Sequence, residues 1–370
     1  MSAKTVKKEN AARLRTFFDS LAAKGLGGAV LDRRDDYFYL SGYTGSDAVL
    51  VLSVKAGKGW LITDSRYTEE AEKTAPGIEV LEWRDGFAAF TGRLLKKLRL
   101  KKVGYTPNSM TAAFFAGMKA EAGGVTEWRD VGSMLSLQRA VKSASEIAAM
   151  RAALACAEAA FKKSRRRWKV GMTEIEVKND LEWEMKRLGA ESTSFETIVA
   201  VGANASLPHA HAGNRKIQAG KMLLIDFGAQ LNRYCSDLTR TLWPGGDIPA
   251  VWRKRYQAVL EAQQAGIDRI KAGVPTTNPY AGAVEVFKKY GLAEKFTHSL
   301  GHGIGLVVHE VPRLSAIDTN ILTEGFIVTV EPGVYFPGSG GIRVEEMVLV
   351  GKDGATILSS LPKRLEDAVF

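Results

Sequence analysis

The chain has 370 residues, 45% of them hydrophobic and 25% charged, and 51 basic against 41 acidic residues give a formal net charge of +10. This length exceeds what one hydrophobic core usually serves, so the composition indicates a globular protein of two domains. It has no apolar run of the roughly 18 residues that a membrane span needs, and its start does not resemble a signal peptide. Its two cysteines, Cys156 and Cys235, are too few for a disulfide framework. We therefore predict a cytoplasmic location and no membrane partner.

The first part of the chain, residues 1–137, alternates helical and strand-like patterns and therefore predicts an α/β domain. Helices are expected at 5–24, 66–74, 86–99 and 109–121, and strands at 28–31, 48–54, 59–62, 77–82 and 102–105. This part contains no histidine, so we expect it to serve shape, partner contact or substrate access. Arg66 and Tyr67 are its most motif-like residues, and a structural role is the default for them.

Basic residues gather in two short segments, 96–102 and 162–169. One interpretation is a surface for nucleic acid or another polyanion. The other is solvated helix faces, which we favour because neither segment has the interleaved aromatic residues of a single-strand-binding platform. We therefore predict no nucleic-acid partner.

The second part, residues 138–370, opens on two helices with the same start signal. Ser143-Ala-Ser-Glu146 and Thr173-Glu-Ile-Glu176 have the spacing of a capping box, and the helices that begin there are expected to end near residues 168 and 189. A Gly- and Pro-rich loop follows at 202–213, and such loops often carry working residues. Other helices are expected at 249–272 and 277–290, and strands at 195–201, 296–305, 326–336 and 341–350.

A predicted β-hairpin in this part contains two acids. Asp226 and Asp237 each lie in an apolar run, and the polar residues 230–233 separate the two runs. A turn centred on Leu231 and Asn232 would place Asp226 directly opposite Asp237. Opposed like charges destabilise a sheet, and buried ones need a proton or a cation between them. The alternative is an exposed hairpin face with solvated acids.

All five histidines of the chain fall between residues 209 and 309, and two further acids follow at 331 and 345. His302 is flanked by glycines, which let the backbone approach a neighbour closely. Glu331 and Glu345 each interrupt a strand with a buried pattern, and with Asp226 and Asp237 they make four carboxylates beside one imidazole. Such an oxygen-rich set suits Mn²⁺, Co²⁺ or Fe²⁺, and Zn²⁺ less typically. Four negative charges offset two divalent cations, whose bridging hydroxide would hydrolyse a polarised carbonyl.

These motifs resemble the metallopeptidases with the pita-bread fold, a family that holds methionine aminopeptidase, aminopeptidase P, prolidase and creatinase. The matching segments are Asp226 with Asp237-Leu-Thr-Arg240, Gly301-His-Gly-Ile-Gly305, His309-Glu-Val-Pro312, Glu331-Pro-Gly333 and Gly341-Ile-Arg-Val-Glu345. Tyr43-Thr-Gly-Ser46 and residues 62–68 are similar to stretches of bacterial Xaa-Pro aminopeptidases. The resemblance implies an α/β creatinase-like N-terminal domain at 1–137, followed by an α+β pita-bread catalytic domain at 138–370.

The resemblance also implies a role for each matching acid and for one histidine. Asp226 would bind one metal ion, and Asp237 and Glu345 would bridge two. His302 and Glu331 would bind the second metal ion. Glu331 would in addition handle the proton of the attacking water.

The resemblance also implies that residues beside this ligand set bind the substrate. His209 and His309 would hydrogen-bond the substrate and the tetrahedral intermediate, and such donors typically contribute ~10²–10³ in rate. Arg343 would hold a carboxylate in place. His211 is a candidate for substrate contact, with an ordinary loop residue as the alternative, and His298 is expected to be a packed histidine near the ligands.

Three further features concern the surroundings of the site. Tyr335 and Phe336 are candidates for the pocket that grips the proline ring, although core aromatic residues are commoner. Glu346 replaces the aspartate that often follows the bridging glutamate in the family, and Val307 stands where many relatives carry an acid. These two departures put the tuning around the ligands in doubt rather than catalysis.

The leading hypothesis from the sequence is a two-metal Xaa-Pro aminopeptidase that releases an N-terminal residue ahead of proline. The alternative is prolidase, which cuts only dipeptides and needs a cationic group for the C-terminal carboxylate of the substrate. Creatinase, which works without metal, and a non-catalytic binding protein on the same fold are weaker hypotheses, because the ligand set is complete. The resemblance also implies two divalent metal ions, Mn²⁺ foremost with Co²⁺, Fe²⁺ or Zn²⁺ as alternatives. The implied partners are peptides with proline in the second position, and the implied assembly is a homodimer.

Overall fold

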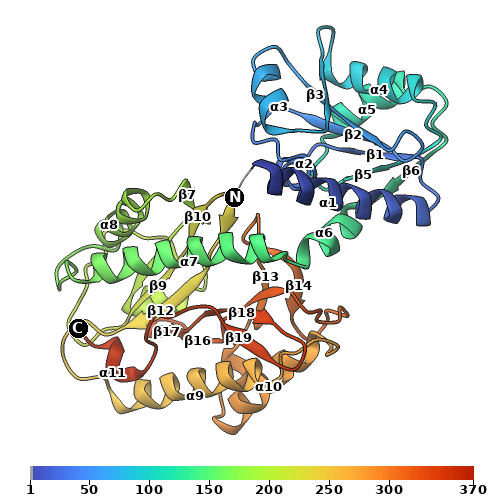
Figure 1. Cartoon of the computed structure of the whole chain (residues 1–370). Helices are drawn as coiled ribbons and strands as arrows, with labels where there is room; N and C mark the ends of the chain where they lie inside the picture. Colours follow the sequence, from blue (N-terminus) through green and yellow to red (C-terminus); the bar gives the residue numbers. More distant parts are fainter. Residues whose placement is uncertain (1–2) are drawn as a thin grey trace. The chain divides into compact units, whose positions relative to one another are not determined.

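The structure is a computed structural model that describes the backbone of residues 3–370 and the side chains from residue 8 onward. The chain folds into two compact units, Met1–Arg139 and Ala140–Phe370, and Figure 1 traces both in colours that follow the sequence. Each unit has its own sheets and its own buried apolar side chains.

The first unit is built on a mixed six-stranded sheet with the strand order β4-β3-β2-β1-β5-β6 (Figure 1). Its strands are β1 (Gly28–Leu31), β2 (Val49–Ser53), β3 (Lys58–Thr63), β4 (Glu79–Glu82), β5 (Lys102–Tyr105) and β6 (Glu127–Asp130). Its helices are α1 (Ala3–Ala23), α2 (Arg34–Ser41), α3 (Thr68–Thr74), α4 (Phe87–Lys97), α5 (Ala112–Glu121) and α6 (Gly132–Ala140). The α/β alternation that the sequence predicts is therefore confirmed.

The sequence pattern missed three elements of this unit, α2, β6 and α6. Helix α2 begins with charged residues that are typical of a turn, but Tyr37 and Leu40 are buried and Asp36 forms a buried ion pair with Arg139 at 2.7 Å. Strand β6 carries charged residues because it is an edge strand that pairs only with β5. Tertiary contacts, rather than local pattern, stabilise these two elements.

The second unit contains four small sheets within the described residues, ordered β11-β10-β7, β12-β9-β8, β14-β13-β15-β18-β19 and β16-β17. The first strands are β7 (Ser192–Thr193), β8 (Ile198–Val201), β9 (Leu223–Phe227), β10 (Ala229–Leu231), β11 (Tyr234–Cys235) and β12 (Leu238–Leu242). The later strands are β13 (Gly301–Gly303), β14 (Glu310–Leu314), β15 (Ile327–Val330), β16 (Gly333–Phe336), β17 (Gly340–Arg343), β18 (Glu346–Val350) and β19 (Ala355–Ile357).

Helices cover these sheets. The helices are α7 (Ala144–Arg165), α8 (Glu174–Arg187), α9 (Ala250–Ile267), α10 (Thr277–Lys289) and α11 (Leu365–Ala368), with short 3₁₀ turns η1 (Gly202–Ser206) and η2 (Ala293–Lys295). Helix α7 packs on β10 and β11, and α9 packs on β15, β16 and β17 (Figure 1). The strands that carry the candidate ligands therefore lie between helices.

Both predicted capping boxes are confirmed. The Ser143 hydroxyl accepts a hydrogen bond from the Glu146 backbone N–H, and the Glu146 carboxylate accepts one from the Ser143 N–H at 2.9 Å. Thr173 and Glu176 make the same reciprocal pair at the start of α8. Because these signals involve residues three positions apart, they can be detected without knowledge of the fold.

The acid hairpin forms, but the predicted pairing within it is wrong. Asp226 lies opposite Thr239 rather than Asp237, so the register differs by two residues from the prediction. The turn consists of Asn232 and Arg233, both with positive φ (51° and 67°), which is the conformation of a type I′ hairpin turn. Because side chains alternate with a period of two, this shift leaves both acids on the predicted face of the hairpin.

Two predicted strands are each broken at an acid. The run at 326–336 divides into β15 and β16, with Glu331 at the break, and the run at 341–350 divides into β17 and β18, with Glu345 at the break. Strands β15 and β18 belong to the five-stranded sheet, whereas β16 and β17 pair with each other in a separate sheet. Both acids therefore lie where the chain passes from one sheet to another.

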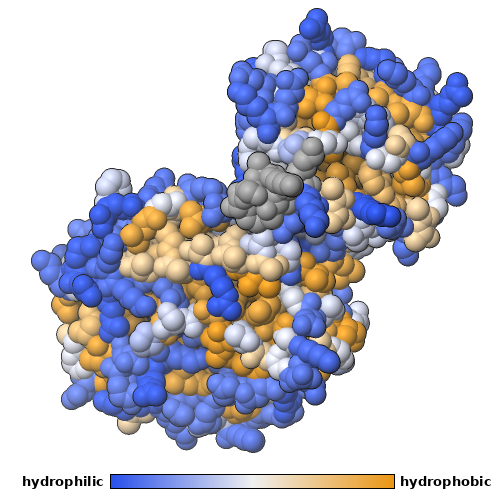
Figure 2. Space-filling model, viewed as in Figure 1, coloured by the Kyte–Doolittle hydropathy of each residue, from blue (hydrophilic) through white to orange (hydrophobic). Residues whose placement is uncertain are grey.

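Several residues of the two basic segments form ion pairs on the surface. Lys102 pairs with Glu127 at 3.1 Å, and Arg167 pairs with Asp180 at 2.9 Å. Figure 2 shows hydrophilic residues spread over the visible surface of both units. Within residues 3–370, no helix is long and apolar enough to cross a membrane.

Candidate metal centre and its cavity

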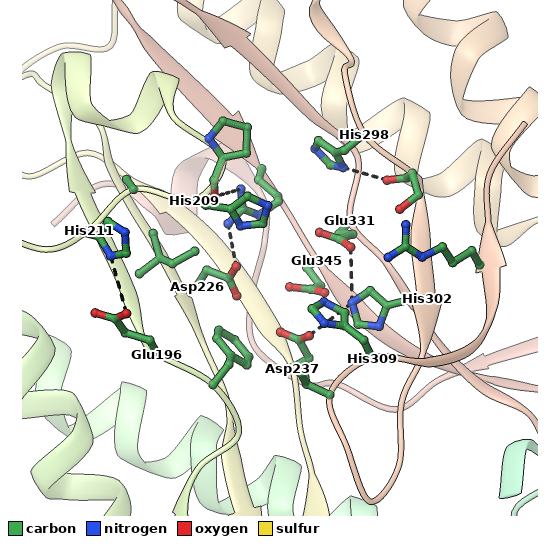
Figure 3. Close-up of a pocket in the computed structure, with 18 residues that line it drawn as sticks. Glu196, His209, His211, Asp226, Asp237, His298, His302, His309, Glu331 and Glu345 are labelled. Carbon is green, nitrogen blue, oxygen red and sulfur yellow. Dashed lines mark hydrogen bonds and ion pairs between the residues drawn. The ribbon is translucent and has the colours of Figure 1, made fainter. Parts of the chain in front are cut away.

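One cavity of about 510 Å³ in the second unit brings the sequence-predicted residues together (Figure 3). The predicted residues that line it are His209, His211, Asp226, Asp237, His302, His309, Glu331, Arg343 and Glu345. Tyr335, which the sequence also predicts for the site, is not among the lining residues.

Five separate positions in the chain supply the acids and the histidine at the centre of the cavity. Asp226 lies in β9, Asp237 directly precedes β12, and His302 is the middle residue of β13. Glu331 follows β15, and Glu345 lies between β17 and β18. Each residue therefore lies on or beside a strand, and strands hold side chains more precisely than free loops do.

Asp237, His302 and Glu345 form the tightest group, and each offers a ligand atom within 4.8 Å of the other two. Burial raises the pKa of the Asp237 carboxyl well above its usual value, and the nearby carboxylates of Glu345 and Asp226 raise it further. Burial raises the pKa of Glu345 in the same way, and Glu331 adds to the effect. Ionised acids this close are unstable unless protons or cations lie between them.

The tautomer of His302 leaves a lone pair that faces these acids. Its Nδ1 lies 3.0 Å from the Gly303 carbonyl oxygen, which can only accept, so Nδ1 carries the proton. Burial lowers the pKa of His302 to about 3, so the ring is neutral. Its Nε2 lone pair then lies 3.6 Å from carboxylate oxygens of both Asp237 and Glu331. Lone pairs that converge in this way fit a cation.

Glu331 shares the electrostatic environment of this group. Burial raises the pKa of its carboxyl to about 8, with a further contribution from Asp226 that opposes the lowering effect of Arg343. An acid with a pKa near neutrality can accept or release a proton during a reaction. Glu331 is therefore a further acid of the same cluster, and its affinity for a proton is raised in the metal-free protein.

Asp226 is held by Arg343 on one side only. The Arg343 Nη2 atom donates to Asp226 Oδ2 at 2.6 Å, while Asp226 Oδ1 is buried and has no hydrogen-bond partner among the described residues. Arg343 is itself fixed, because its Nε donates to the Thr239 hydroxyl at 3.1 Å and Thr239 donates to Glu345 at 2.8 Å. A buried oxygen without a partner is costly, and a bound cation would satisfy it.

The donor set therefore fits divalent metal ions. Four carboxylates supply hard oxygen ligands, one neutral imidazole supplies a nitrogen, and no thiol of the described residues lines the cavity. Figure 3 shows the carboxylates of Asp226, Asp237, Glu331 and Glu345 turned toward the same space. Two positive ions of charge two would balance the four negative charges of this set.

Two histidines and an arginine supply hydrogen-bond donors beside the acids. His309 packs edge to face on His302, with ring centroids 4.4 Å apart, and burial followed by the Arg313 and His209 charges lowers the pKa of His309. His309 is therefore neutral and can donate one N–H into the cavity. His209 and Arg313 are exposed residues of the cavity wall.

The remaining histidines have other partners. His211 is 83% exposed and lies 3.6 Å from Glu196 at the cavity rim. His298 lines the cavity, but its Nδ1 bonds the Ser299 carbonyl at 2.8 Å and its Nε2 bonds the Tyr335 hydroxyl at 3.0 Å. Both ring nitrogens of His298 are therefore satisfied within the protein.

The two aromatic residues that follow Glu331 in sequence lie outside the cavity. The Tyr335 hydroxyl accepts a hydrogen bond from Arg343 at 2.8 Å, so Tyr335 acts on Asp226 through that arginine. Phe336 packs against Trp252 and beneath the Arg255 guanidinium. Neither residue lines the cavity: Tyr335 lies behind Arg343 and His298, and Phe336 lies against Trp252 and Arg255.

Glycines on both sides of His302 are required by close packing. A Cβ at Gly301 would lie 1.9 Å from the Thr329 carbonyl oxygen, and one at Gly303 would lie 2.1 Å from that of Val311. The predicted close approach is therefore to the backbones of neighbouring strands. It places His302 deep in the sheet, where its ring meets the acids.

Sequence reasoning missed Arg313 and the apolar part of the cavity wall, which includes Phe195, Ile198 and Val308. Arg313 lies opposite His302 across β13 and β14, and its charge influences both His302 and His309. The signal that could have found it is its position four residues after His309, on a strand that returns past the histidine motif.

Comparison with known proteins gives two family matches. The model of metallopeptidase family M24 matches residues 148–352, and the model of the creatinase/prolidase N-terminal domain matches residues 13–141. The first match contains all the acids and histidines of the cavity, whereas the second ends at the start of the second unit.

Similar proteins extend over nearly the whole chain. The Xaa-Pro dipeptidase of Pyrococcus horikoshii is 30% identical over 95% of this chain and 98% of its own length. The structure of the Xaa-Pro dipeptidase from Bacillus anthracis superposes with a TM-score of 0.90 at 35% identity, covering 98% of this chain and 100% of that one. The structure of the X-Pro aminopeptidase from Thermotoga maritima superposes with a TM-score of 0.88 at 32% identity, covering 96% and 99%.

Proposed function

The chain belongs to metallopeptidase family M24 and carries a creatinase/prolidase N-terminal domain, and from this premise we propose that it is an Xaa-Pro dipeptidase. Family membership makes the protein a hydrolase and confirms the expected fold, an α/β creatinase-like domain followed by an α+β pita-bread catalytic domain. The proposed reaction is hydrolysis of the peptide bond between an N-terminal residue and proline.

The observation that supports a dipeptidase is Arg313. A dipeptide carries its C-terminal carboxylate on the proline itself, so the enzyme needs a cation close to the reacting bond. Arg313 is exposed, lines the cavity beside His309 and forms no ion pair within residues 8–370 that would compete for its guanidinium. A guanidinium can hold a carboxylate with two parallel hydrogen bonds. The names of the relatives in Pyrococcus horikoshii and Bacillus anthracis support the same choice over the aminopeptidase that leads the sequence analysis.

Five residues are the proposed metal ligands, namely Asp226, Asp237, His302, Glu331 and Glu345. Two divalent ions bound there, Mn²⁺ foremost with Co²⁺, Fe²⁺ or Zn²⁺ as alternatives, would lower the pKa of water and polarise the scissile carbonyl. Support comes from the charge balance, the buried Asp226 oxygen without a partner and the His302 lone pair that faces two carboxylates.

The side chains of the protein would carry the proton and the developing charge. Glu331 would take the proton of the attacking water, because its carboxylate lies in the ligand group, with an oxygen 3.6 Å from His302 Nε2. His309, kept neutral by its environment, and His209 would donate hydrogen bonds to the oxygen of the tetrahedral intermediate. Arg343 would hold Asp226 in place, since the two are joined at 2.6 Å.

Proline explains why such an enclosed site is needed. The Xaa-Pro bond has no N–H, and the ring fixes φ, so a protease cannot bind this substrate by adding it to a β-sheet. Recognition must come from the two ends of the dipeptide. The acids at the centre of the cavity would meet the amino terminus, and Arg313 would meet the carboxylate.

The proposal is tested with Ala-Pro, Ala-Pro-amide and Ala-Pro-Ala as substrates. We expect turnover of Ala-Pro alone, and Arg313→Ala should raise KM for Ala-Pro by about 10- to 100-fold, since a hydrogen bond to a charged group contributes roughly 1.5–3 kcal/mol. Arg269→Ala, which removes an arginine paired with Glu285 outside the cavity, is the control and should leave KM unchanged. Efficient cleavage of Ala-Pro-Ala, with no effect of Arg313→Ala, would contradict the dipeptidase proposal.

That last outcome would favour the second candidate, an Xaa-Pro aminopeptidase. The likeness to the X-Pro aminopeptidase from Thermotoga maritima supports this candidate, and its cavity chemistry would be the same. The two candidates differ only in whether the space beyond Arg313 accepts a longer chain. A homodimer and a cytoplasmic location stay predictions, for which sedimentation and cell fractionation are the direct measurements.

A further inference from the structure

The loop 202–213 carries His209 and His211 but has little regular structure of its own. It begins with η1 after β8 and then continues as an irregular segment to Gly213, before β9 begins at Leu223. His209 is exposed on this loop, whereas Ala210 beside it is buried. Irregular loops are usually the mobile parts of a protein. A histidine that must donate to a defined oxygen therefore needs something that fixes its loop.

A fully buried acid beneath this loop meets that need. Glu174, the first residue of α8, has 0% of its surface exposed. Its Oε1 accepts hydrogen bonds from the Val201 N–H at 2.8 Å and the Asn204 side-chain amide at 2.9 Å. Its Oε2 accepts one from the Gly213 N–H at 3.0 Å. One carboxylate thus joins the residue before the loop, a residue within it and its last residue.

The position of Glu174 makes these bonds strong. Hydrogen bonds to an ionised, buried group are shorter and stronger than those between neutral groups, and the N-terminus of a helix favours a negative charge. The nearest cation is Arg215, whose Nη1 lies 3.7 Å from Oε2 and whose side chain is 61% exposed. The Glu174 carboxylate is therefore stabilised mainly by its hydrogen bonds from the loop and the residue before it.

Main-chain bonds reinforce the same junction. The Glu174 N–H donates to the Arg215 carbonyl at 2.9 Å, and the Ile175 N–H donates to the Gly213 carbonyl at 3.1 Å. These bonds bring the end of the loop to the start of α8, but they do not reach Val201 or Asn204. Within the described residues, Glu174 is the side chain whose hydrogen bonds connect both ends of the loop.

We propose that Glu174 is a positioning residue for His209. The hydrogen bonds of Glu174 close the loop 202–213, so that the imidazole of His209 stays at the cavity wall. This role rests on the proposed function of His209 as a donor to the reacting carbonyl. Glu174 lines no part of the cavity and touches no reacting atom. Its effect on the reaction passes through the loop.

Glu174→Gln is the most informative change, because it keeps the shape and removes one acceptor. The carboxylate offers two accepting oxygens to three donors, whereas an amide offers one oxygen and places an NH₂ group against the remaining N–H. Either the Gly213 end or the Val201 end of the loop is then left unpaired. Glu176→Gln is the matched control, since Glu176 lies in the same helical turn, is exposed and bonds only Thr173.

Hydrogen exchange followed by mass spectrometry tests the first step without any assay of activity. We expect Glu174→Gln to speed exchange of amides in 201–213 by about tenfold, the equivalent of the lost charged hydrogen bond, and Glu176→Gln to leave that segment unchanged. Asn204→Ala, which removes the bond to Glu174 and a longer one of 3.5 Å to the His211 carbonyl, should also speed exchange in this segment and serves if Glu174→Gln does not fold. Unchanged exchange in 201–213 for both folded variants would overturn the proposal.

A double-mutant cycle with His209 tests the second step on the metal-loaded enzyme. We expect Glu174→Gln to lower kcat by about tenfold in the wild-type background, with little change in KM, and to have almost no effect after His209→Ala, because the positioned group is then absent. An equal loss of kcat in both backgrounds would overturn the positioning role. Absence of dipeptidase activity in the wild type would instead contradict the proposed function, and the exchange result would still decide whether Glu174 closes the loop.

Discussion

Glu345 and Glu346 are consecutive, both buried, and lie in opposite electrostatic surroundings. Glu346 is 2% exposed and faces Arg240 at 2.9 Å and Lys363 at 3.6 Å. Glu345 is 1% exposed and faces the cavity, where burial raises its pKa and the carboxylates of Glu331 and Asp226 raise it further. The protein thus gives Glu346 two cations of its own, whereas Glu345 lies in a cluster of four carboxylates for which the described residues supply one arginine, Arg343, paired with Asp226.

This contrast distinguishes a structural ion pair from a ligand set. A buried carboxylate with an internal partner contributes to a single packed arrangement, as Glu346 does through Arg240 and the Ser359 hydroxyl. A buried cluster of carboxylates without such partners costs stability, and its retention indicates a ligand that arrives from outside. Glu346 therefore belongs to the paired side and not to the cavity.

Removal of metal ions should have the largest effect. We expect dialysis against a strong chelator to reduce hydrolysis of Ala-Pro by about 10³-fold or more, because metal ions supply several kcal/mol of charge stabilisation, and we expect added Mn²⁺ to restore it. Metal content measured by mass spectrometry before and after dialysis is the control. Full activity at zero metal content would contradict the inference that the cavity acids hold metal ions required for hydrolysis.

Disruption of the paired side should have the next largest effect, and on stability rather than chemistry. Arg240 donates to Glu346 and also to the carbonyl oxygens of Glu345, Leu361 and Pro362. We expect Arg240→Met to lower the free energy of unfolding by about 3–5 kcal/mol, since it leaves a buried acid and several acceptors unpaired. Unfolding in urea measures this change.

The control for that experiment is an exposed pair of the same type. Arg269→Met removes the partner of Glu285, whose side chain is 56% exposed. Surface ion pairs contribute at most about 1 kcal/mol, so this variant should remain close to the wild type. Equal losses for the two arginine variants would mean that burial does not distinguish the two pairs.

Matched neutralisation of the two neighbouring acids should then give opposite signs. In metal-stripped protein at pH 8.5, we expect Glu345→Gln to stabilise the fold by roughly 1 kcal/mol, because the folded wild type must either bury this charge beside the other acids or take up a proton from solution. We expect Glu346→Gln to destabilise it by roughly 2 kcal/mol, because Arg240 loses its counter-charge. Thermal unfolding of the three proteins in parallel provides the measurement, and destabilisation by both changes would contradict the contrast between the two sides.

The smallest expected effect is a dependence of stability on pH. Burial raises the pKa of Glu331 from its usual value of 4.5 to about 8, so between these values the folded, metal-stripped protein holds a proton that the unfolded chain has released. The free energy of unfolding must then fall as pH rises through this window, because the folded state binds more protons. We expect a continuous fall in the free energy of unfolding between pH 4.5 and pH 8, measured by urea unfolding at a series of pH values.

Glu331→Gln isolates the contribution of that group. The variant cannot titrate at this position, so its stability should change less between pH 4.5 and pH 8 than that of the wild type. Parallel curves for the two metal-stripped proteins would show that Glu331 does not retain its proton in the folded state.

The hairpin shows how far sequence reasoning extends into the site. Its two apolar runs and polar turn were sufficient to place Asp226 and Asp237 on one face, because that inference needs only the two-residue period of a strand. The pairing itself depends on which residues adopt positive φ in the turn, and Asn232 with Arg233 is not among the common sequences for such a turn. The prediction was therefore right about the face and wrong about the partner.

The cavity wall shows where sequence reasoning stops. The predicted acids and histidines could be recognised because each stands out within its own segment, as Glu331 does after an apolar strand. Arg313 does not stand out, since an arginine on an exposed strand position is ordinary, and Glu174 has the appearance of a common first-turn helix residue. Their positions matter only because β13 meets β14 and because the start of α8 packs beneath the loop 202–213.

The sequence by itself determined the local signals: the capping boxes, the hairpin, the acids at 331 and 345 within apolar runs, and the motifs that resemble the family. These depend on residues a few positions apart, whose geometry is set by the backbone alone. Only the tertiary structure decided that Glu345 faces acids while Glu346 faces Arg240, and that His209 rests on a loop closed by Glu174. Those relations join residues that are distant in the chain, and no local propensity specifies which of them will meet.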